Sequence, residues 1–326
     1  MKNIKIAKKT FITITGLLLI FMNGVSFASN ITKLTYSPRI IILTAFPPEY
    51  KPWLKVLKPS LHIAIYGVPS GLQCDSQLVC VVDTHEGSEN TAMSVTHIVD
   101  STNLNLKKTI FIRAGIGGGV LNRSAPALGS VYLANWVCSW GFGYHYLSTS
   151  GIPSWAPTKP PYADDRWQTL SFRVDPNLLE KAISFSKHAQ LKNNKIDKYL
   201  DGVYHIRNNM PRVLIGANVS GDDFWIGSKY QDIAVKIVKT YSMGEADYGT
   251  TAMEELGDLT ALSSVGLARH YLSVRGTGNY DVNNRFSVSR IVNMQKSRWE
   301  LAAKIAILNE VTVTKAIIRG LLSERM

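Results

Sequence analysis

The chain has 326 residues, of which 45% are hydrophobic and 18% are charged, with 24 glycines and 13 prolines. This composition excludes a disordered chain, a collagen-like repeat and a small scaffold held together by disulfides. Lysine and arginine total 36 against 24 acidic residues, which gives a formal charge of +12. The basic residues are scattered along the chain, so nucleic acid is not an expected partner.

The first residues have the organisation of an export signal. Four lysines precede an uncharged, mostly apolar run from Phe11 to Met22, and small residues follow up to Ala28. We predict a signal peptide over 1–28 and a periplasmic or secreted protein over 29–326, with an uncleaved anchor as the alternative. The charge then falls to near +8, because this segment holds four lysines and no acid. No later segment offers 18 uninterrupted apolar residues, so we expect a soluble mature chain without an integral membrane segment.

The three cysteines suggest different roles. Cys74 and Cys80 lie between two apolar stretches and, in an exported protein, predict a small-loop disulfide, with two free thiols as the alternative. Cys138 stands in an apolar setting, which favours a buried, inert thiol. No pair of cysteines or histidines has the spacing of a zinc site, so no metal is expected.

Apolar runs alternate with segments of helical periodicity along the chain, and these predict strands and helices respectively. In chain order they are a strand at 39–45, a helix at 48–57, strands at 61–66 and 78–82, a helix at 89–99, strands at 109–114 and 128–137, a helix at 177–191, a strand at 212–217, helices at 230–241 and 251–262, a strand at 267–274, and a helix at 298–322 with a break near 310–314. This alternation predicts one three-layer α/β/α domain with a mixed central sheet between helices.

Residues 139–176 interrupt this pattern with glycines, prolines and aromatic clusters. We expect an irregular excursion there that acts as a lid, an interface or a substrate filter. Ligands of open α/β sheets bind beyond the carboxyl ends of the strands. The candidate site therefore consists of the segments 44–50, 115–119, 218–225 and 275–281.

Two candidate groups follow the early strands. Glu49 lies just past a buried strand at the start of a predicted helix, whose dipole favours an ionised carboxylate. It suits a general base or an acceptor for substrate hydroxyls, and a surface glutamate is the alternative. In the run from Arg113 to Gly119, the arginine and the backbone at Gly115 can hold an oxyanion, although a plain tight turn has the same pattern.

Three further polar segments occur later in the chain. Asp222 and Phe224 in SGDDFW combine an acid with an aromatic ring, as in sites for flat heterocycles, with an Asx-turn beside core aromatics as the alternative. Glu254 in TAMEELG is either a site residue or an ordinary helix former. In RGTGNYD, Asn279 can donate to and accept from a base edge, and Asp281 adds a carboxylate.

Seven segments occur in the order TAFPPE, HEGSENTAMSVTHIV, FIRAGIGGG, LGSVYLA, SGDDFW, TAMEELG and VRGTGNYD. In this order the sequence resembles the purine nucleoside permease family, over roughly residues 38–322. Members of that family look like nucleoside phosphorylases and nucleosidases in fold. The resemblance therefore implies a nucleoside phosphorylase-like domain, a purine nucleoside as ligand and a homo-oligomer.

The resemblance also implies roles for single residues. Glu49 stands where nucleosidases of this fold carry the glutamate that activates water, and Arg113 stands where phosphorylases hold phosphate. The pair Met253–Glu254 matches the residues that pack under ribose and bind its hydroxyls. Phe224 matches the ring that stacks on the purine, and Asn279 matches the residue that contacts the purine edge.

One departure from the family pattern concerns the leaving base. Adenine-cleaving relatives carry aspartate at the position of Asn279, and that aspartate helps to protonate the base. An amide cannot act as a comparable acid. Three alternatives follow: Asp281 or Asp222 takes the role, the substrate is a 6-oxopurine nucleoside, or the protein binds without cleaving.

The nucleophile is also open at the level of sequence. Glu49 favours water and Arg113 favours phosphate as a co-substrate, whereas Ile116 replaces a hydroxyl residue that often contacts phosphate in phosphorylases. Cleavage passes through an oxocarbenium-like state in either case. The expected activity is cleavage of the N-glycosidic bond of purine nucleosides by hydrolysis or phosphorolysis, without a cofactor. The alternative is a non-catalytic nucleoside-binding component of purine nucleoside uptake.

Overall fold

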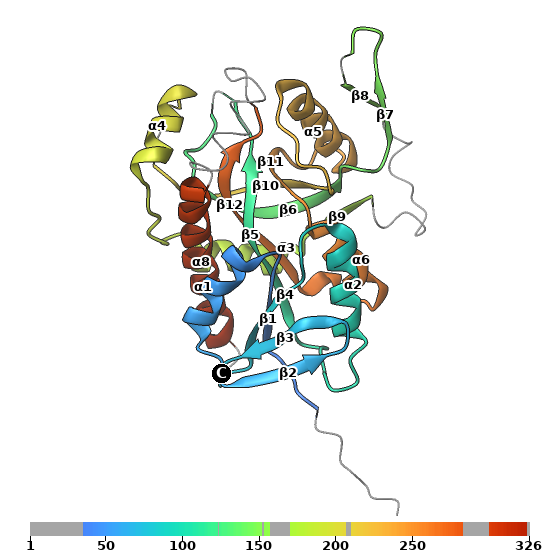
Figure 1. Cartoon of the computed structure of the whole chain (residues 1–326), viewed down its shortest axis with the longest axis vertical. Helices are drawn as coiled ribbons and strands as arrows, with labels where there is room; N and C mark the ends of the chain where they lie inside the picture. The colour runs from blue at the N-terminus through green and yellow to red at the C-terminus, as the bar shows by residue number, and fades with distance from the viewer. Residues whose placement is uncertain are drawn as a thin grey trace, which may run out of the picture. The chain divides into compact units, whose positions relative to one another are not determined.

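The computed structural model describes residues 35–122, 124–151, 153–156, 170–206, 210–282 and 300–324. In these residues ten strands form one sheet in the order β11-β10-β6-β12-β5-β1-β4-β3-β2, with β9 beside β6 (Figure 1). Two more strands, β7 and β8, form a separate hairpin. The predicted signal peptide at 1–28 lies outside the described residues.

The elements have the following bounds. The strands are β1 (Ile40–Thr44), β2 (Leu61–Ile65), β3 (Val68–Cys74), β4 (Val79–Asp83), β5 (Ile110–Gly119), β6 (Val131–Ser139), β7 (Tyr144–Leu147), β8 (Pro153–Ala156), β9 (Ser171–Arg173), β10 (Val213–Ser220), β11 (Tyr248–Ala252) and β12 (Tyr271–Tyr280). The helices are α1 (Pro47–Leu57), α2 (Ser88–Val99), α3 (Pro176–Ser186), α4 (Lys195–Val203), α5 (Ser228–Tyr241), α6 (Glu255–Ser264), the short 3₁₀ helix η2 (Ala268–His270) and α8 (Glu300–Ser323).

Strand β1 shows how the chain builds two apolar layers on one sheet. Ile40 and Ile42 pack on one face with residues of α1, α3 and α8, whereas Ile41 and Leu43 pack on the other face with residues of α2 and α6. Successive side chains of a strand point to opposite faces, so a strand covered on both faces is a continuous apolar run. Parallel and antiparallel pairs occur in the same sheet. The predicted three-layer α/β architecture with a mixed sheet is confirmed.

Strand β11 closes part of the sheet into a ring. It pairs in parallel with β10 and antiparallel with β5, where Thr251 lies opposite Gly118. Strand β12 lies between β5 and β6, and β6 pairs with β10. The strands β5, β12, β6, β10 and β11 therefore form a closed circuit of hydrogen-bonded pairs. This closure brings the ends of β5, β11 and β12 together.

Two segments predicted as loops are the ends of long strands instead. β5 continues through Gly115 to Gly119, and β12 continues through Asn279 to Tyr280. The two strands pair along this whole length, with Tyr280 opposite Gly119. Glycine-rich ends have few apolar side chains that would mark them as strand in the sequence, so both predictions stopped too early.

Other boundaries also differ from the predictions. The predicted helix at 251–262 starts too early, because Thr251 ends β11 and α6 begins at Glu255. Strand β3, which pairs with both β2 and β4, and helix α4 were not predicted. The break predicted in the last helix is wrong: α8 is continuous, and the Thr314 hydroxyl donates to Glu310 Oε1 at 2.6 Å inside it.

The segment predicted as an excursion contains regular structure where it is described. Its residues form the β7–β8 hairpin, which extends away from the main sheet in Figure 1, and β9, which pairs antiparallel with β6. A disulfide joins Cys74 of β3 to Cys80 of β4, so the predicted pairing is confirmed. Cys138 is a buried free thiol, and burial raises its pKa to about 12. No helix in the described residues is both long and apolar enough to span a membrane.

Candidate active site

A pocket lies where several strands of the ring end, and it collects residues from six separate segments of the chain. The first come from the end of β1 and the start of α1, and others from the turn after β4, the end of β5 and the loop after β10. The rest come from the end of β11 and from β12. In the described part of the chain its lining consists of Ala45, Phe46, Glu49, Glu86, Ile116, Gly117, Gly118, Asp223, Phe224, Trp225, Thr251, Ala252, Met253, Glu254, Arg275 and Asn279. The pocket therefore occupies the predicted edge of the sheet.

Glu49 is buried in the first turn of α1 and forms part of the pocket wall. Its Oε2 accepts a hydrogen bond from the Ala45 N–H at 2.9 Å, and its Oε1 accepts one from the Ile116 N–H at 2.8 Å. Burial raises the pKa of Glu49 to about 7, although the positive charge of Arg275 acts in the opposite direction. A carboxyl group in this state can accept a proton near neutral pH.

Gly115 permits this position of Glu49. A Cβ atom at residue 115 would lie 2.2 Å from Glu49 Oε1, closer than any side chain tolerates. The glycine therefore supports the carboxylate from behind and is not among the residues that line the pocket. Its predicted part in phosphate binding is not supported by this placement.

Arg275 connects the carboxylates of the site, and sequence analysis did not single it out. Its Nη2 donates to Glu254 Oε2 at 2.7 Å, its Nε donates to Glu255 Oε1 at 2.5 Å, and its Nη1 lies 3.9 Å from Glu49 Oε1. Nη1 also donates to the Ile116 carbonyl at 2.9 Å. Glu254 accepts a further hydrogen bond from the Gly87 N–H at 3.3 Å, so its carboxylate is held from two sides at the pocket.

Aromatic rings form another wall of the pocket. Phe224 is 59% exposed, which leaves its ring free to contact a ligand. The neighbouring Trp225 is buried and stacks on Trp140, with ring centroids 5.0 Å apart, and the Trp140 Nε1 donates to Asp223 Oδ2 at 3.1 Å. Met253 and Asn279, for which the sequence predicts contacts with a ligand, also line the pocket.

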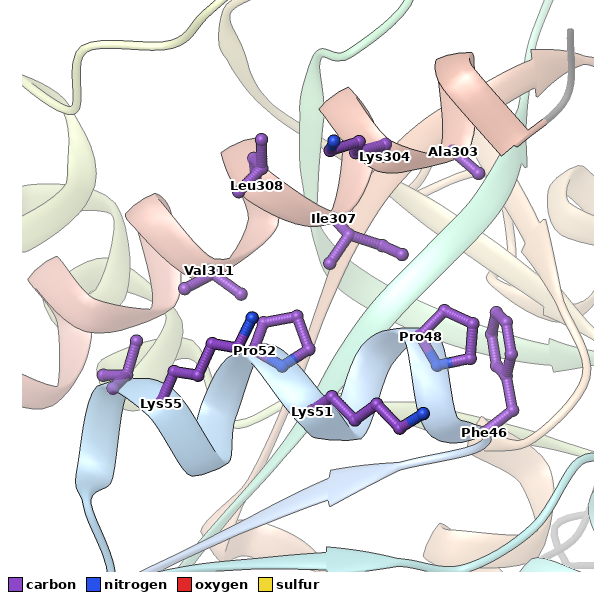
Figure 2. A pocket seen from close by; sticks show the side chains of 11 residues that line it. Phe46, Pro48, Lys51, Pro52, Lys55, Ala303, Lys304, Ile307, Leu308 and Val311 are labelled. Atoms are coloured by element: carbon purple, nitrogen blue, oxygen red, sulfur yellow. The ribbon is translucent and has the colours of Figure 1, made fainter.

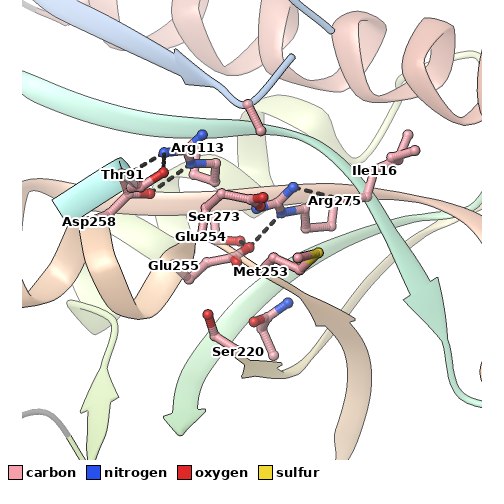
Figure 3. A network of polar contacts seen from close by, with 12 residues as sticks. Thr91, Arg113, Ile116, Ser220, Met253, Glu254, Glu255, Asp258, Ser273 and Arg275 are labelled. Atoms are coloured by element: carbon pink, nitrogen blue, oxygen red, sulfur yellow. Dashed lines mark hydrogen bonds and ion pairs between the residues drawn. The ribbon is translucent and has the colours of Figure 1, made fainter. Parts of the chain in front are cut away.

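Arg113 is not brought into the pocket. It is fully buried and forms a bidentate ion pair with Asp258 of α6, with Nε and Nη2 at 2.7 Å and 2.6 Å from the carboxylate oxygens (Figure 3). Nη2 also donates to Thr84 Oγ1 at 3.0 Å. Nη1 has no hydrogen-bond partner among the described residues, but Arg113 does not belong to the pocket lining. In this position the arginine compensates a buried aspartate instead of holding a phosphate.

Two predicted acids also lie outside the pocket lining. Asp222 accepts a hydrogen bond from the Ser88 N–H at 2.6 Å at the start of α2, and burial is the main cause that raises its pKa to about 6. Asp281 is buried and accepts a hydrogen bond from the Tyr248 hydroxyl, and burial raises its pKa well above the usual value. Both residues therefore stabilise segments around the pocket, and neither touches its interior.

Glu86 and Asp223 complete the acidic lining, and of these two Glu86 was not proposed from the sequence. Burial and the nearby Glu254 raise the pKa of Glu86. Asp223 was visible in SGDDFW, but the choice between it and Asp222 needed the structure. In the described residues no group of three or more histidine, cysteine, aspartate or glutamate side chains is arranged to hold a metal ion.

A second, larger cavity of about 680 Å³ lies between α1 and α8 (Figure 2). Phe46 lines both cavities, so they adjoin. The described lining of the larger one is apolar apart from Lys51, Lys55 and Lys304, and it holds no carboxyl group. Of these two cavities, the pocket around Glu49 is therefore the one whose described lining offers carboxyl groups for proton transfer.

The chain has the fold of nucleoside phosphorylases and nucleosidases. A 5′-methylthioadenosine/S-adenosylhomocysteine nucleosidase from Helicobacter pylori is similar over 86% of this chain and 98% of its own, with a TM-score of 0.56 and 12% identity. The corresponding Streptococcus pneumoniae enzyme covers 88% of this chain and 100% of its own, with a TM-score of 0.56 and 17% identity. Futalosine hydrolase of H. pylori has a TM-score of 0.55 at 12% identity, over 86% of this chain and 97% of its own. At these identities the likeness shows the fold alone.

The sequence then identifies the family. The profile of the purine nucleoside permease (NUP) family matches residues 37–325, and the chain belongs to this family. A purine nucleoside permease of Candida albicans is 26% identical over 259 residues, which is 73% of this chain. A probable purine nucleoside permease of Schizosaccharomyces pombe is 23% identical over 253 residues, covering 70% of this chain and 72% of its own. The chain spans 62% of the length of the Candida relative.

Proposed function

We propose that this protein binds purine nucleosides in the pocket around Glu49 and hydrolyses their N-glycosidic bond. The observation that carries this proposal is the presence of three kinds of group in one pocket. Glu49 is a buried carboxyl able to accept a proton, Glu254 is a carboxylate held by Arg275, and Phe224 is an exposed aromatic ring. These groups suit water, ribose hydroxyls and a purine ring respectively.

In the proposed reaction, a water molecule beside Glu49 attacks C1′ of the ribose. One water proton passes to Glu49, the water oxygen forms a bond to C1′, and the C1′–N bond breaks with its electron pair leaving on the purine. The purine nitrogen takes up a proton from solvent, and Glu49 returns its proton to solvent. Glu254, held by Arg275, binds ribose hydroxyls and stabilises the positive charge that develops on the sugar.

Hydrolysis is favoured over phosphorolysis by the charges around the pocket. Its described lining has four carboxyl side chains, Glu49, Glu86, Asp223 and Glu254, and one cationic side chain, Arg275. The arginine is already bonded to two glutamates, and Arg113 is bonded to Asp258 outside the pocket. A phosphate dianion would therefore meet uncompensated negative charge.

A second candidate is nucleoside capture for uptake without cleavage. The family and the curated relatives bear the name permease, and this observation favours the second candidate. Asn279 lines the pocket as an amide, which is a poor general acid for a departing base, and Asp281 is not part of the lining. Export through a signal at 1–28, which we also propose, would place such a binding protein outside the cell membrane.

The test measures free base by chromatography after incubating the purified protein with inosine, guanosine or adenosine, with and without phosphate. We expect base without phosphate, loss of release in Glu49→Gln, and retention in Glu180→Gln, the same change at an exposed glutamate of α3. Base that forms only with phosphate would overturn hydrolysis. Absence of base together with a rise in Tm on adding nucleoside would support capture for uptake.

A further inference from the structure

Arg275 lies beside Glu254 and Glu255 in the buried network next to the pocket (Figure 3), and Glu49 is a third carboxylate near it. Its Nε donates to Glu255 at 2.5 Å and its Nη2 donates to Glu254 at 2.7 Å, whereas Glu49 lies 3.9 Å from Nη1. The short contacts therefore fix the guanidinium of Arg275 beside the start of α6. Glu49 feels its charge but receives no hydrogen bond from it.

Glu255 differs from the other two glutamates because it does not line the pocket. It is fully buried, and its Oε1 also accepts a hydrogen bond from the Ser273 hydroxyl at 2.8 Å. Burial is the largest single influence and raises the pKa of Glu255, but the charges of Arg275 and Arg113 and the hydrogen bonds from Arg275 and Ser273 together outweigh it, so the net pKa is lowered. Glu255 is thus an ionised group whose contacts are with the arginine and its surroundings.

We propose that Glu255 is a positioning residue that holds Arg275 beside α6 and compensates its charge, so that Glu49 remains able to exchange a proton with water in the pocket. This inference rests on the role proposed above for Glu49. Glu255, which lies outside the pocket, thereby controls Glu49, the proton acceptor inside it. A glutamate that only filled the core would not change how Glu49 titrates.

The electrostatic reason lies in the groups that face Glu49. Among the residues that the structure describes, the groups that act on Glu49 are Arg275 from β12, Glu254 from the segment before α6, Glu310 from α8, and two backbone N–H groups. Glu310 is buried, and burial raises its pKa well above the usual value, which disfavours its charged form. Of the side chains facing Glu49, Arg275 is therefore the one that favours its ionised form.

Loss of Glu255 would leave more of the positive charge of Arg275 uncompensated near Glu49. An opposite charge within about 4–6 Å lowers a carboxyl pKa by roughly 1–3 units. Without this compensation Glu49 ionises at a lower pH, and a carboxylate with a lower pKa is a weaker base at the pH of the reaction.

The direct test is a ¹³C NMR titration of the full chain labelled at the glutamate carboxyl carbons. The resonance that disappears in Glu49→Gln belongs to Glu49 and reports its midpoint without any ligand. We expect Glu255→Gln to lower this midpoint by about one pH unit or more. Glu255→Asp, which keeps the charge, should shift it less than half as far, and Glu180→Gln should not shift it. An unchanged midpoint in Glu255→Gln would overturn the inference.

Base release measured against pH separates this inference from the proposed function. The acidic limb of the profile should move down in Glu255→Gln together with the NMR midpoint. A shifted midpoint in a protein that releases no base would refute hydrolysis and leave the control of Glu49 by Glu255 standing. Where Glu255→Gln does not fold, Ser273→Ala takes its place, because it removes one hydrogen bond to Glu255. A smaller downward shift of the Glu49 midpoint in Ser273→Ala supports the inference. The absence of any shift overturns it.

Discussion

Substitution of Gly115 by alanine tests how the proton acceptor is held. The added Cβ would lie 2.2 Å from Glu49 Oε1, 2.6 Å from Cδ and 2.7 Å from Oε2. All three atoms belong to one carboxylate, and an ordinary contact needs at least 3.4 Å. The carboxylate must therefore move by about 1 Å, which breaks or stretches its hydrogen bonds from Ala45 and Ile116.

The expected cost follows from those two hydrogen bonds. A hydrogen bond to a charged group contributes about 1.5–3 kcal/mol, and alanine in a strand recovers about 0.5–1 kcal/mol relative to glycine. With both hydrogen bonds affected, we expect Gly115→Ala to lower the free energy of unfolding by about 2–5 kcal/mol. A misplacement of about 1 Å at a reacting group can slow catalysis by about 100-fold, so base release should fall by that order.

Gly278→Ala is the matched control. It adds the same methyl group to β12 near the pocket, but its Cβ would make only ordinary contacts of 3.8 Å and 4.0 Å. Urea unfolding and base release should both stay near those of the original protein in this control. If Gly115→Ala behaves like Gly278→Ala in both assays, Glu49 is not held by the close approach described here.

Three further predictions follow from the charges of the site. Folded Glu49 keeps its proton up to about pH 7 but loses it near 4.5 when unfolded, so folding is favoured less as pH rises across this range. Glu49→Gln should therefore gain stability relative to the original protein between these values, by at most about 3 kcal/mol in urea unfolding. Arg113→Met should destabilise the fold by about 3 kcal/mol, since it leaves Asp258 buried without its cation. Inosine 5′-monophosphate should bind at least about 10-fold more weakly than inosine in calorimetry, because carboxylates that include Glu86 line the pocket.

Each of these predictions has an outcome that contradicts it. A stability difference between Glu49→Gln and the original protein that does not vary with pH would show that Glu49 titrates alike in both states. If Arg113→Met leaves the free energy of unfolding unaltered, or abolishes an effect of phosphate on base release, Arg113 binds a ligand. Equal affinity for nucleoside and nucleotide, unaffected by Glu86→Gln, would refute the electrostatic selection.

The layered fold follows from the sequence because strands covered on both faces, such as 40–44 in β1, are continuous apolar runs. The strand ends of β5 and β12 did not follow from the sequence, because glycines give no hydrophobic pattern. These two ends are strands because they pair with each other. The closure of the ring by β11 also has no local signal. It depends on contacts such as Thr251 opposite Gly118, which are far apart in the sequence.

The strand ends and the family resemblance together predicted that Glu49, Phe224, Glu254 and Asn279 belong to the site, and all four line the pocket. The sequence did not predict which of two arginines lies in the pocket. Arg113 and Arg275 both lie on strands, and only the register of the strands and the position of α6 determine which of them reaches the pocket.

The place of β12 in the sheet has a consequence for how the chain folds. β12 ends at residue 280, yet it lies between β5 and β6, which end at residues 119 and 139. The two earlier strands therefore keep unpaired edges until the last third of the chain arrives. Such long-range pairing gives a high contact order, which slows folding and prolongs the exposure of apolar strands. Arg275 and Asn279 arrive with β12, so the pocket is completed only in that late step.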